Sequence, residues 1–396
     1  NFDGNVYASD ALDKGAAYAV IDDEKFKTDD RMILVDDALK VLQNLATYHR
    51  RKLGVPILAL TGSNGKTTTK ELIYGVLSQK YRCRATQGNY NNHIGVPLTL
   101  LQMDESTEFG VVEMGANNPG EIAALCDIAY PDYGYITNFG RVHLEGFGSL
   151  QGVIEGKTEM YRHLAAHDKT VFVNAPDPVQ MERTASMKRY VIGNVKESGA
   201  DDPGCNVRFI DADPFVRMGF EGLEIRSDLI GAYNYQNMAA AACIGKYFEV
   251  NMEDIAKGIE SYRPSNNRSQ VIQRGSNTII LDAYNANPNS MEAAIANLKG
   301  LGAKKKVAVL GDMFEVGADS AMEHQKIAEL IDSTNVDAIY LIGENFAEVA
   351  LESDRVKYFP KYEDFADHFA ALDFENSTFL IKASRGMALE RVLELL

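Results

Sequence analysis

Short apolar runs alternate with stretches of helical spacing along most of the chain. The apolar run at 55–60 leads into a glycine-rich turn, and helical spacing follows over 67–78. The same order recurs downstream, with expected strands at 110–114, 133–138 and 170–174 and expected helices at 121–129 and 152–164. Strands that alternate with helices in this way predict a largely parallel sheet that is covered by helices on both faces.

A second α/β series begins near residue 267. Its expected strands are at 278–281, 306–310, 338–342 and 378–381, and its expected helices are at 290–298 and 321–332. The polar stretch 261–268 lacks periodicity and is the predicted linker between the two series. Before it, the turn-rich residues 201–227 are expected to form a small antiparallel addition, which a helix over 234–248 follows.

In the first 45 residues, the stretches with strand-like or helical patterns are short. A helical stretch at 11–19 and a strand-like stretch at 18–21 precede a polar break at 22–30. This is too little to bury a core of its own. The sequence opens on Asn1, inside what reads as a structured segment, so we expect a leader or an earlier part of a domain upstream.

Composition narrows the class of protein. With 396 residues and 45% hydrophobic content, the chain is long enough for two or three domains. Its net charge of -16 argues against duplex nucleic acid or an anionic membrane as the main partner. No apolar run approaches the 18 residues that a membrane-spanning helix needs, and the four cysteines are far apart. We therefore expect a soluble cytoplasmic protein with reduced thiols.

The turn after the first apolar run carries the clearest chemical signal. Residues 61–67 read Thr-Gly-Ser-Asn-Gly-Lys-Thr. Glycines let backbone N–H groups turn inward on a polyphosphate, Lys66 adds positive charge, and Thr67 can bind magnesium at the start of a helix. Leu60 stands where the general phosphate-loop pattern has its first glycine. The segment predicts a site for a nucleoside triphosphate.

Three residues downstream are weaker candidates when each is taken alone. Glu113 ends an apolar strand and could bind a metal ion, although an acidic residue in that place is as often only solvated. His143 also follows a strand, and a lone histidine is usually structural or exposed. Lys157 lies on an expected helix, where a surface lysine is the ordinary interpretation.

Together these segments resemble the Mur ligases of peptidoglycan synthesis over essentially the whole chain. The motifs that carry the resemblance occur in order at 61–70, 88–97, 113–117, 143–149, 282–288 and 310–317. The last two, Asp-Ala-Tyr-Asn-Ala-Asn-Pro and Leu-Gly-Asp-Met-Phe-Glu-Val-Gly, are the most specific. They favour the family member that adds D-alanyl-D-alanine. The sister ligase that adds diaminopimelate is less similar, because its Asp-Asn-Pro-Arg signature is absent.

The resemblance implies an α/β protein of three domains. Residues 1–50 would be part of an N-terminal UDP-substrate-binding domain, and 51–265 a central ATP-binding domain built on a P-loop ATPase-type parallel sheet. Residues 266–396 would form a C-terminal Rossmann-like domain that brings the incoming amine and closes over the nucleotide. The linker near residue 265 agrees with this division.

The family's nucleotide and metal residues map onto this sequence by motif. The resemblance implies that Lys66 holds the β- and γ-phosphates, that Thr67 and Glu113 bind one Mg²⁺, and that His143 serves a second. Lys157 matches a lysine that carbon dioxide carbamylates into an anionic metal bridge. The expected ATP-binding residues are Gly62, Ser63, Asn64, Gly65, Lys66, Thr67, Thr68, Asn234, Asn237, Arg268, Asp282 and Asn285. Tyr233 stands where many relatives have histidine.

Two further pairs are expected to contact the other substrates. Asn91 and Asn92 would face the muramoyl-peptide carboxylate, although asparagines in a loop are equally often turn formers. Ser384 and Arg385 follow a strand and could receive the dipeptide carboxylate, with a structural ion pair as the alternative. Lys66, His143 and Lys157 are the expected catalytic residues.

The function that follows is ATP-dependent amide-bond formation. Such a ligase would join D-alanyl-D-alanine to UDP-N-acetylmuramoyl-tripeptide through an acyl phosphate, and we expect it to act as a monomer. Folylpolyglutamate synthase is the alternative within the superfamily, and the motifs at 284–288 and 310–317 argue against it. A P-loop ATPase of another class is less favoured, because its strand would end in aspartate rather than Glu113.

Overall fold

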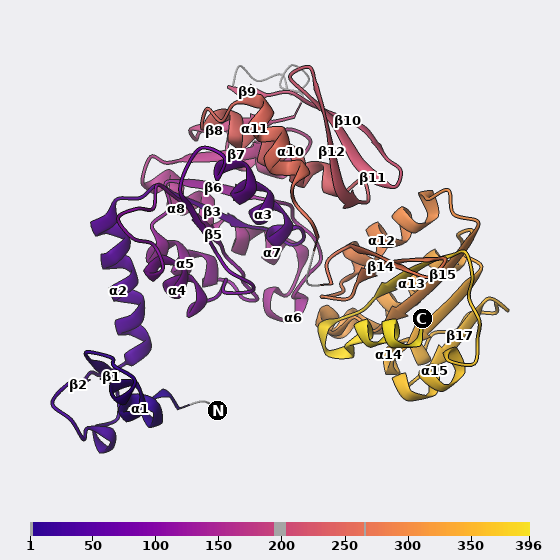
Figure 1. Cartoon of the computed structure of the whole chain (residues 1–396), viewed down its shortest axis with the longest axis horizontal. Helices are drawn as coiled ribbons and strands as arrows, with labels where there is room; N and C mark the ends of the chain where they lie inside the picture. Colours follow the sequence, from indigo (N-terminus) through magenta and orange to yellow (C-terminus); the bar gives the residue numbers. More distant parts are fainter. Residues whose placement is uncertain (1–2, 194–202, 265–266) are drawn as a thin grey trace.

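The computed structural model describes residues 3–193, 203–264 and 267–396. It is an α/β protein of three parts: a small N-terminal unit at the far end of helix α2, a central domain, and a C-terminal domain (Figure 1). Of the predicted linker, residues 261–264 and 267–268 are described, whereas Ser265 and Asn266 lie outside the described residues. None of the described helices has the length and apolar character needed to cross a membrane.

The N-terminal unit is small. It contains η1 (Gly4–Tyr7), α1 (Ala8–Asp13), β1 (Ala19–Ile21), η2 (Glu24–Phe26) and β2 (Met32–Leu34), and the two strands pair in parallel. The expected helix over 11–19 is wrong in its bounds, because the chain turns at Gly15, which has a φ of +99°. The unit buries a separate small cluster, Ala8, Leu12, Ala19, Ile21 and Met32. Helix α2 (Ala38–Leu53), capped by Asp37 and ended by Gly54, leads from it to the central domain.

The central domain is built on a seven-stranded parallel sheet. In sheet order the strands are β4 (Cys83–Ala85), β5 (Phe109–Glu113), β3 (Ile57–Thr61), β6 (Tyr133–Ile136), β7 (Thr170–Asn174), β8 (Arg189–Ile192) and β9 (Gly204–Cys205). Each described pair is parallel. Because β4 and β5 lie on one side of β3 and β6 to β9 on the other, the strand order reverses beside β3, where α/β sheets commonly bind ligands.

Helices cover both faces of this sheet, as predicted. One face packs on α3 (Lys66–Leu77), α10 (Asn234–Tyr247) and α11 (Met252–Glu260). The other packs on α2, α4 (Gly95–Leu101), α5 (Glu121–Ala129), α7 (Leu150–Lys157) and α8 (Glu159–Ala166). Two short helices complete the domain, α6 (Leu144–Phe147) and α9 (Pro178–Arg183).

The single helix expected over 152–164 is instead α7 followed by α8. The break is at Thr158, which serves as the last cap of α7 and the first of α8. Its hydroxyl donates to the Ile154 carbonyl at 2.8 Å. A threonine side chain that bonds back to the preceding turn competes with the helix ladder, and hydrophobic periodicity does not reveal this.

The antiparallel addition is confirmed. Strands β10 (Val207–Ala212), β11 (Phe215–Phe220) and β12 (Leu223–Ile230) form a three-stranded antiparallel sheet beside α10 and α11 (Figure 1). Alternate residues of β11, Val216, Met218 and Phe220, are buried against the central core. The sheet thus extends one face of the central domain.

The C-terminal domain has a six-stranded sheet. Its strands are, in sheet order, β13 (Gln270–Arg274), β14 (Asn277–Asp282), β18 (Ser377–Lys382), β15 (Lys305–Gly311), β16 (Ala338–Ile342) and β17 (Val356–Phe359). Among the described strand pairs of this sheet, only β13–β14 is antiparallel. The helical segments are α12 (Pro288–Gly300), η3 (Phe314–Asp319), α13 (Ser320–Asp332), α14 (Glu344–Ala347), α15 (Tyr362–Phe369), η4 (Arg385–Met387) and η5 (Leu389–Leu395). Separate cores fill its two faces.

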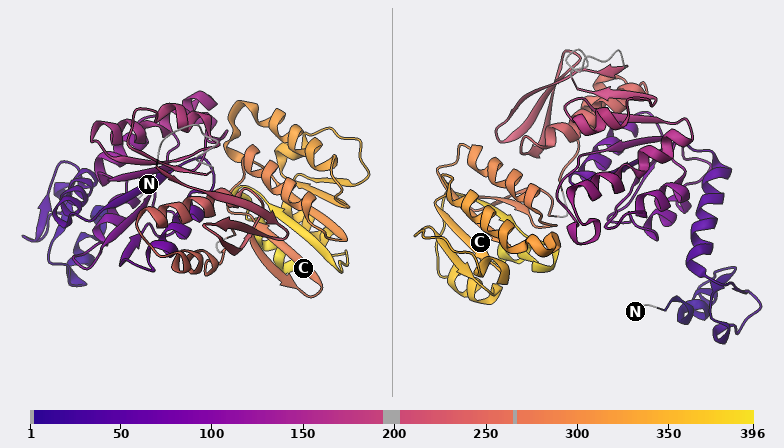
Figure 2. Two further views of the ribbon diagram at one scale, coloured as in Figure 1. Left: turned by 90° about the horizontal axis from the view of Figure 1, so that it is seen from above. Right: turned by 180° about the vertical axis from the view of Figure 1, so that it is seen from behind.

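The central and C-terminal domains lie side by side, whereas the N-terminal unit lies away from the C-terminal domain (Figure 2). The carboxyl ends of β3 and β5 face the space between the two large domains, and so does the carboxyl end of β14, because residues that follow these strands line one shared cavity. The fold therefore brings loops from two sheets to one site.

Candidate active site

A cavity of about 1010 Å³ lies between the central and C-terminal domains. It brings together most of the residues that the sequence singled out, namely Ser63, Asn64, Gly65, Lys66, Thr67, Thr68, Asn91, Asn92, Glu113, His143, Asn234, Asn237, Arg268, Asp282 and Asn285. Gly62, Lys157, Ser384 and Arg385 do not line it. Candidates that lie more than 200 residues apart in sequence thus converge.

The loop between β3 and α3 is tightly enclosed. Leu60, the departure from the general pattern, is fully buried within β3, so the turn begins at Gly62. Gly62 has a φ of +142°, and a Cβ placed there would lie 1.9 Å from the Thr137 hydroxyl oxygen. Gly65 has a φ of +80°, and a Cβ placed there would lie 2.8 Å from Asn237 Oδ1. Glycine is required at both positions by backbone conformation and by space.

Lys66 lies folded against this loop. Its Nζ donates to the Gly62 carbonyl at 2.8 Å and to the Ser63 carbonyl at 3.2 Å. Burial lowers the pKa of Lys66, and the nearby Glu113 carboxylate opposes that shift. The ammonium is held at the cavity wall, where an anionic group could replace the carbonyl partners.

Glu113 is a buried acid at the end of β5, so the interpretation as a merely solvated residue is wrong. Its side chain is 1% exposed. Oε1 accepts from Asn91 Nδ2 at 2.8 Å, whereas Oε2 has no hydrogen-bond partner among the described residues. A buried carboxylate oxygen without a donor is costly unless a cation or a donor reaches it. This oxygen fits a cation site in the cavity.

Magnesium is compatible with this arrangement. The described parts of the chain bring no three histidine, cysteine or acidic side chains together as a metal site. Magnesium, however, is usually held by one or two protein oxygens together with substrate phosphates and water. Glu113 and Thr67 both line the cavity and could supply those oxygens.

Lys157 is buried, which overturns the interpretation of this residue as a surface lysine. It is 1% exposed at the end of α7. No hydrogen bond or ion pair joins its Nζ to another described residue, and the Phe147 ring centroid is 5.7 Å away. Burial, together with the charge of Lys66, lowers the pKa of Lys157 well below its ordinary range. Burial thus shifts this side chain toward the neutral amine relative to an exposed lysine.

His143 links the two domains. It adopts a left-handed backbone conformation, with a φ of +50°, just before α6. Its Nδ1 lies 2.9 Å from Oε2 of Glu315, which belongs to η3 of the C-terminal domain. The hydrogen bond from His143 lowers the pKa of the Glu315 carboxyl, while partial burial works in the opposite direction.

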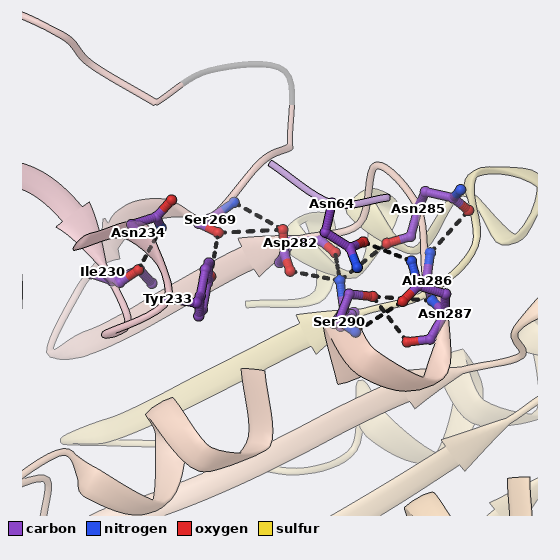
Figure 3. Close-up of polar contacts among 11 residues, drawn as sticks. Asn64, Ile230, Tyr233, Asn234, Ser269, Asp282, Asn285, Ala286, Asn287 and Ser290 are labelled. Carbon is purple, nitrogen blue, oxygen red and sulfur yellow. Dashed lines mark hydrogen bonds and ion pairs between the residues drawn. The ribbon is translucent and has the colours of Figure 1, made fainter. Parts of the chain in front are cut away.

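The start of α10 forms another wall of the cavity. Asn234 donates to the Ile230 carbonyl at 2.8 Å and accepts from Asn237 Nδ2 at 2.7 Å. Asn237 Oδ1 in turn accepts from the Thr69 hydroxyl at 3.0 Å, which ties α10 to α3. The Tyr233 hydroxyl lies 2.8 Å from the hydroxyl of Ser269, the residue that follows the linker (Figure 3). These polar side chains hold one another in place.

The facing wall comes from the end of β14. Asp282 accepts from Lys382 Nζ at 2.6 Å and from the Ser269 backbone N–H at 3.0 Å. Figure 3 shows Ser269 between Tyr233 of the central domain and Asp282 of the C-terminal domain. Asn285 accepts from the Ala286 N–H at 2.9 Å. Ser269, which directly follows the linker, is thus hydrogen-bonded to residues of both domains beside the cavity.

The two predicted substrate pairs differ in their surroundings. Asn91 lines the cavity but donates to Glu113. Asn92 Oδ1 accepts from the Ile94 and Gly95 N–H groups at 3.1 and 2.9 Å, as a turn-forming asparagine does. Ser384 is buried and accepts from the Phe314 N–H at 2.9 Å. Arg385 is exposed and lies 3.4 Å from Glu390, which agrees with the structural alternative.

Sequence reasoning missed the residues that join the domains. Asn287 caps α12, and its Nδ2 donates to Asn64 Oδ1 of the phosphate loop at 2.8 Å (Figure 3). Arg141 lies 2.9 Å from Glu323, which is only 3% exposed. At the start of the C-terminal domain, the Arg268 guanidinium lies over the ring of Tyr284, with Cζ 3.5 Å from the ring centroid. Only the Asn-Pro cap before α12 carries a local signal; the other contacts depend on how the domains meet.

Comparison with known proteins agrees with this arrangement. The family model of the Mur ligase middle domain matches residues 60–245, and the model of the Mur ligase glutamate ligase domain matches residues 267–385. The UDP-N-acetylmuramoyl-tripeptide–D-alanyl-D-alanine ligase of Bacillus subtilis (strain 168) is 36% identical over 406 residues, covering 99% of this chain and 87% of its own.

Solved structures give the same result. A crystal structure of MurF from Acinetobacter baumannii matches with a TM-score of 0.87 and 29% identity, over 99% of this chain and 87% of that one. The MurF ligase of Thermotoga maritima in complex with ADP matches with a TM-score of 0.84 and 28% identity, over 100% and 91%. The family models match both large domains in order, and the B. subtilis relative is 36% identical over 99% of this chain. This chain therefore belongs to the Mur ligase family.

Proposed function

We propose that this chain is an ATP-dependent ligase that joins D-alanyl-D-alanine to UDP-N-acetylmuramoyl-tripeptide in peptidoglycan precursor synthesis. The observation that carries the proposal is the shared cavity, in which a phosphate loop on one domain faces Asp282 and Asn285 on the other. The names of the B. subtilis relative and of the matched MurF structures support this choice of substrates. A cytoplasmic location would follow from the nucleotide-linked substrates.

The proposed reaction has two steps. The tripeptide carboxylate attacks the γ-phosphorus of ATP, the bond to the bridging oxygen breaks, and ADP leaves an acyl phosphate. The amine of the dipeptide then attacks the acyl carbon, loses a proton, and expels inorganic phosphate as the amide forms. Activation is required because a carboxylate oxygen is a poor leaving group, whereas phosphate is a good one.

The residues of the cavity supply positioning and charge. Lys66 would move from the loop carbonyls to the β- and γ-phosphates, where it offsets negative charge that develops during transfer. Arg268 would approach the phosphates from the linker, and Asp282 and Asn285 would close over the nucleotide. Asn234 and Asn237 would line its adenine side. Contacts from both domains would exclude water, which would otherwise hydrolyse the acyl phosphate.

Two Mg²⁺ ions, when bound, would neutralise phosphate charge. Thr67 and the free oxygen of Glu113 would hold the first, and His143 would hold the second after leaving Glu315. Lys157 is proposed to carry a carbamate, because a buried neutral amine is the form that reacts with carbon dioxide. That modification would give the Lys157 side chain a negative charge, which could hold a metal ion.

The remaining site residues are assigned by position. Asn91 would orient Glu113 and reach toward the peptide substrate, with Asn92 shaping the same loop. Ser384 and Arg385 would contribute to the dipeptide side through the segment that follows β18. The domain division that matches these roles is 1–50, 51–265 and 266–396.

The test is phosphate release with a panel of substrates. We expect release that requires both UDP-N-acetylmuramoyl-tripeptide and D-alanyl-D-alanine, with a product heavier than the tripeptide substrate by one dipeptide less water. Equal release with ATP alone would contradict the ligase proposal. Equal addition of glutamate to a folate acceptor would favour folylpolyglutamate synthase instead. Comparing tripeptides that carry lysine or diaminopimelate at position three would define the natural substrate.

A further inference from the structure

The linker places Arg268 in the cavity through an unusual local geometry. Its neighbours Asn267 and Ser269 both have left-handed backbones, with φ values of +58° and +49°. Such conformations are costly for residues other than glycine and persist where surrounding contacts fix them. Here the Tyr284 N–H donates to the Asn267 carbonyl at 3.2 Å, and the Ser269 N–H donates to Asp282 at 3.0 Å.

The side chain of Arg268, the residue between Asn267 and Ser269, stacks on an aromatic ring. Arg268 Cζ is 3.5 Å from the centroid of Tyr284, and both residues line the cavity. The planar cation is attracted by the ring face, and stacking restricts the many rotamers of a long side chain. No hydrogen bond or ion pair fixes the Arg268 guanidinium to another described residue, so the ring is the contact that orients it.

We propose that Tyr284 is a positioning residue, which holds the linker arginine ready to contact the phosphates of the nucleotide. The proposal rests on the proposed function, since it takes from there the role of Arg268. In this arrangement the left-handed backbones of Asn267 and Ser269 aim the arginine, and the ring of Tyr284 fixes its end. The tyrosine acts through its aromatic face, not through its hydroxyl.

The ring has a second, more distant cation. Arg385 Cζ lies 6.0 Å from the same centroid, so a change at Tyr284 could also act through Arg385. A double-mutant cycle separates these routes, because an effect that passes through Arg268 disappears when Arg268 is already alanine. The cycle needs the enzyme variants Tyr284→Leu, Arg268→Ala and the double variant.

The C-terminal domain offers a matched control. Arg391 Cζ lies 3.5 Å from the centroid of Tyr362, the same distance as in the cavity pair. Neither residue lines the cavity. Tyr362→Leu therefore removes an equivalent stack and reports the effect of losing such a pair on folding alone.

The experiment measures the Kd of the full chain for a non-hydrolysable ATP analogue, and then kcat and KM for ATP. We expect Tyr284→Leu to weaken nucleotide affinity or kcat/KM by about three- to thirtyfold, the range of a cation–π contact. Tyr284→Phe should recover most of the loss, and Tyr362→Leu should show none. In the Arg268→Ala background, Tyr284→Leu should have no further effect.

Two results would overturn the proposal. One is a Tyr284→Leu effect of equal size in the Arg268→Ala background, which would place the action of the ring elsewhere. The other is a Tyr284→Phe variant as impaired as Tyr284→Leu, which would assign the role to the hydroxyl. Since analogue binding needs no acceptor substrate, both results stay readable even if the amide-forming activity proves to use other substrates.

Discussion

Some buried charged residues of the central domain differ from those of the C-terminal domain in whether they have a partner. At the central sheet, Glu113 keeps one carboxylate oxygen without a partner, and Lys157 is buried without an ion pair to any described residue. At the C-terminal sheet, Asp282 is bonded to Lys382 at 2.6 Å, and Asp312 accepts from three N–H donors at 2.9–3.0 Å.

The difference indicates two uses of buried charge. Unpaired charged or neutralised groups cost stability, so their retention in the central domain points to ligands that complete them. Paired groups in the C-terminal domain fix loops in one conformation. Removing a central group should therefore cost activity and spare the fold, whereas removing a C-terminal partner should first cost stability.

The largest effect is expected at Lys157. Lys157→Met keeps the buried volume and removes the amine, so we expect turnover to fall at least about 10²- to 10³-fold, with an unchanged or higher midpoint of thermal unfolding. Added bicarbonate should not restore the activity. Phosphate release and calorimetry measure the two quantities.

A buried lysine of the C-terminal sheet is the control for that variant. Lys306 is 2% exposed, and its Nζ donates to the Lys299 carbonyl at 2.8 Å. Lys306→Met should lower the unfolding midpoint and leave turnover near that of the wild type. Near-normal turnover of Lys157→Met would contradict the proposed role of Lys157. It would also contradict the inference that unpaired buried groups of the central domain serve activity.

The next effect is on stability and concerns Lys382, which is 2% exposed. Lys382→Met leaves the Asp282 carboxylate without its cation, and we expect a loss of about 3 kcal/mol in the free energy of unfolding. Combining it with Asp282→Asn should recover much of the loss, because the uncompensated charge is gone. Denaturant titration gives both values. A single variant as stable as the wild type would show that this ion pair does not hold the loop.

A smaller effect is expected where the two domains touch. Arg141 of the central domain lies 2.9 Å from the buried Glu323 of α13, and Lys326 lies 3.1 Å from the same carboxylate. Arg141→Ala should therefore weaken the contact between the two domains by only about 1 kcal/mol, since Lys326 remains and the arginine is partly exposed. The loss should be seen as a higher KM for substrates that contact both domains. An unchanged KM would mean that this ion pair does not help to hold the two domains together.

The smallest effect is a dependence of stability on pH that arises from His324. This residue is fully buried, its Nε2 accepts from the Met313 N–H at 2.9 Å, and burial lowers its pKa below the ordinary 6.5. As the pH falls below 6.5, the unfolded chain takes up the proton before the folded one does. Neutral His324 therefore contributes stability that is complete above pH 6.5 and declines below it.

The comparison variant is His324→Gln, which cannot take up a proton. We expect the free energy of unfolding of the wild type to fall by about 1 kcal/mol more than that of the variant between pH 7 and pH 5.5. Denaturant titrations at a series of pH values measure this difference. Parallel curves for the two proteins would show that His324 is protonated equally in the folded and unfolded states.

Much of the fold could be predicted because buried strands are continuous apolar runs. The expected strand at 338–342 and the expected helix at 121–129 match β16 and α5 residue for residue. Strand β13 was missed because its Gln270–Arg274 segment lies at a sheet edge and is not an apolar run. Strand order was beyond prediction, since insertion of β18 between β14 and β15 depends on packing between distant segments.

Some residues of the candidate site could likewise be predicted from local sequence, and others could not. The phosphate loop follows from local spacing, because its chemistry needs adjacent residues. The burial of Lys157 and the contact of His143 with Glu315 could not be read from the sequence, because each depends on residues from another helix or another domain. The residues that join the domains carry little local signal for this reason.

The side-chain contact between Asn64 and Asn287 has a consequence for the behaviour of the enzyme at different ionic strengths. Both groups are neutral amides, so mobile ions do not weaken their hydrogen bond by screening. Arg141 and Glu292, 3.8 Å apart and both partly exposed, would lose attraction as ions accumulate around them. Salt should thus loosen the rim of the domain contact before it affects the contact at the phosphate loop.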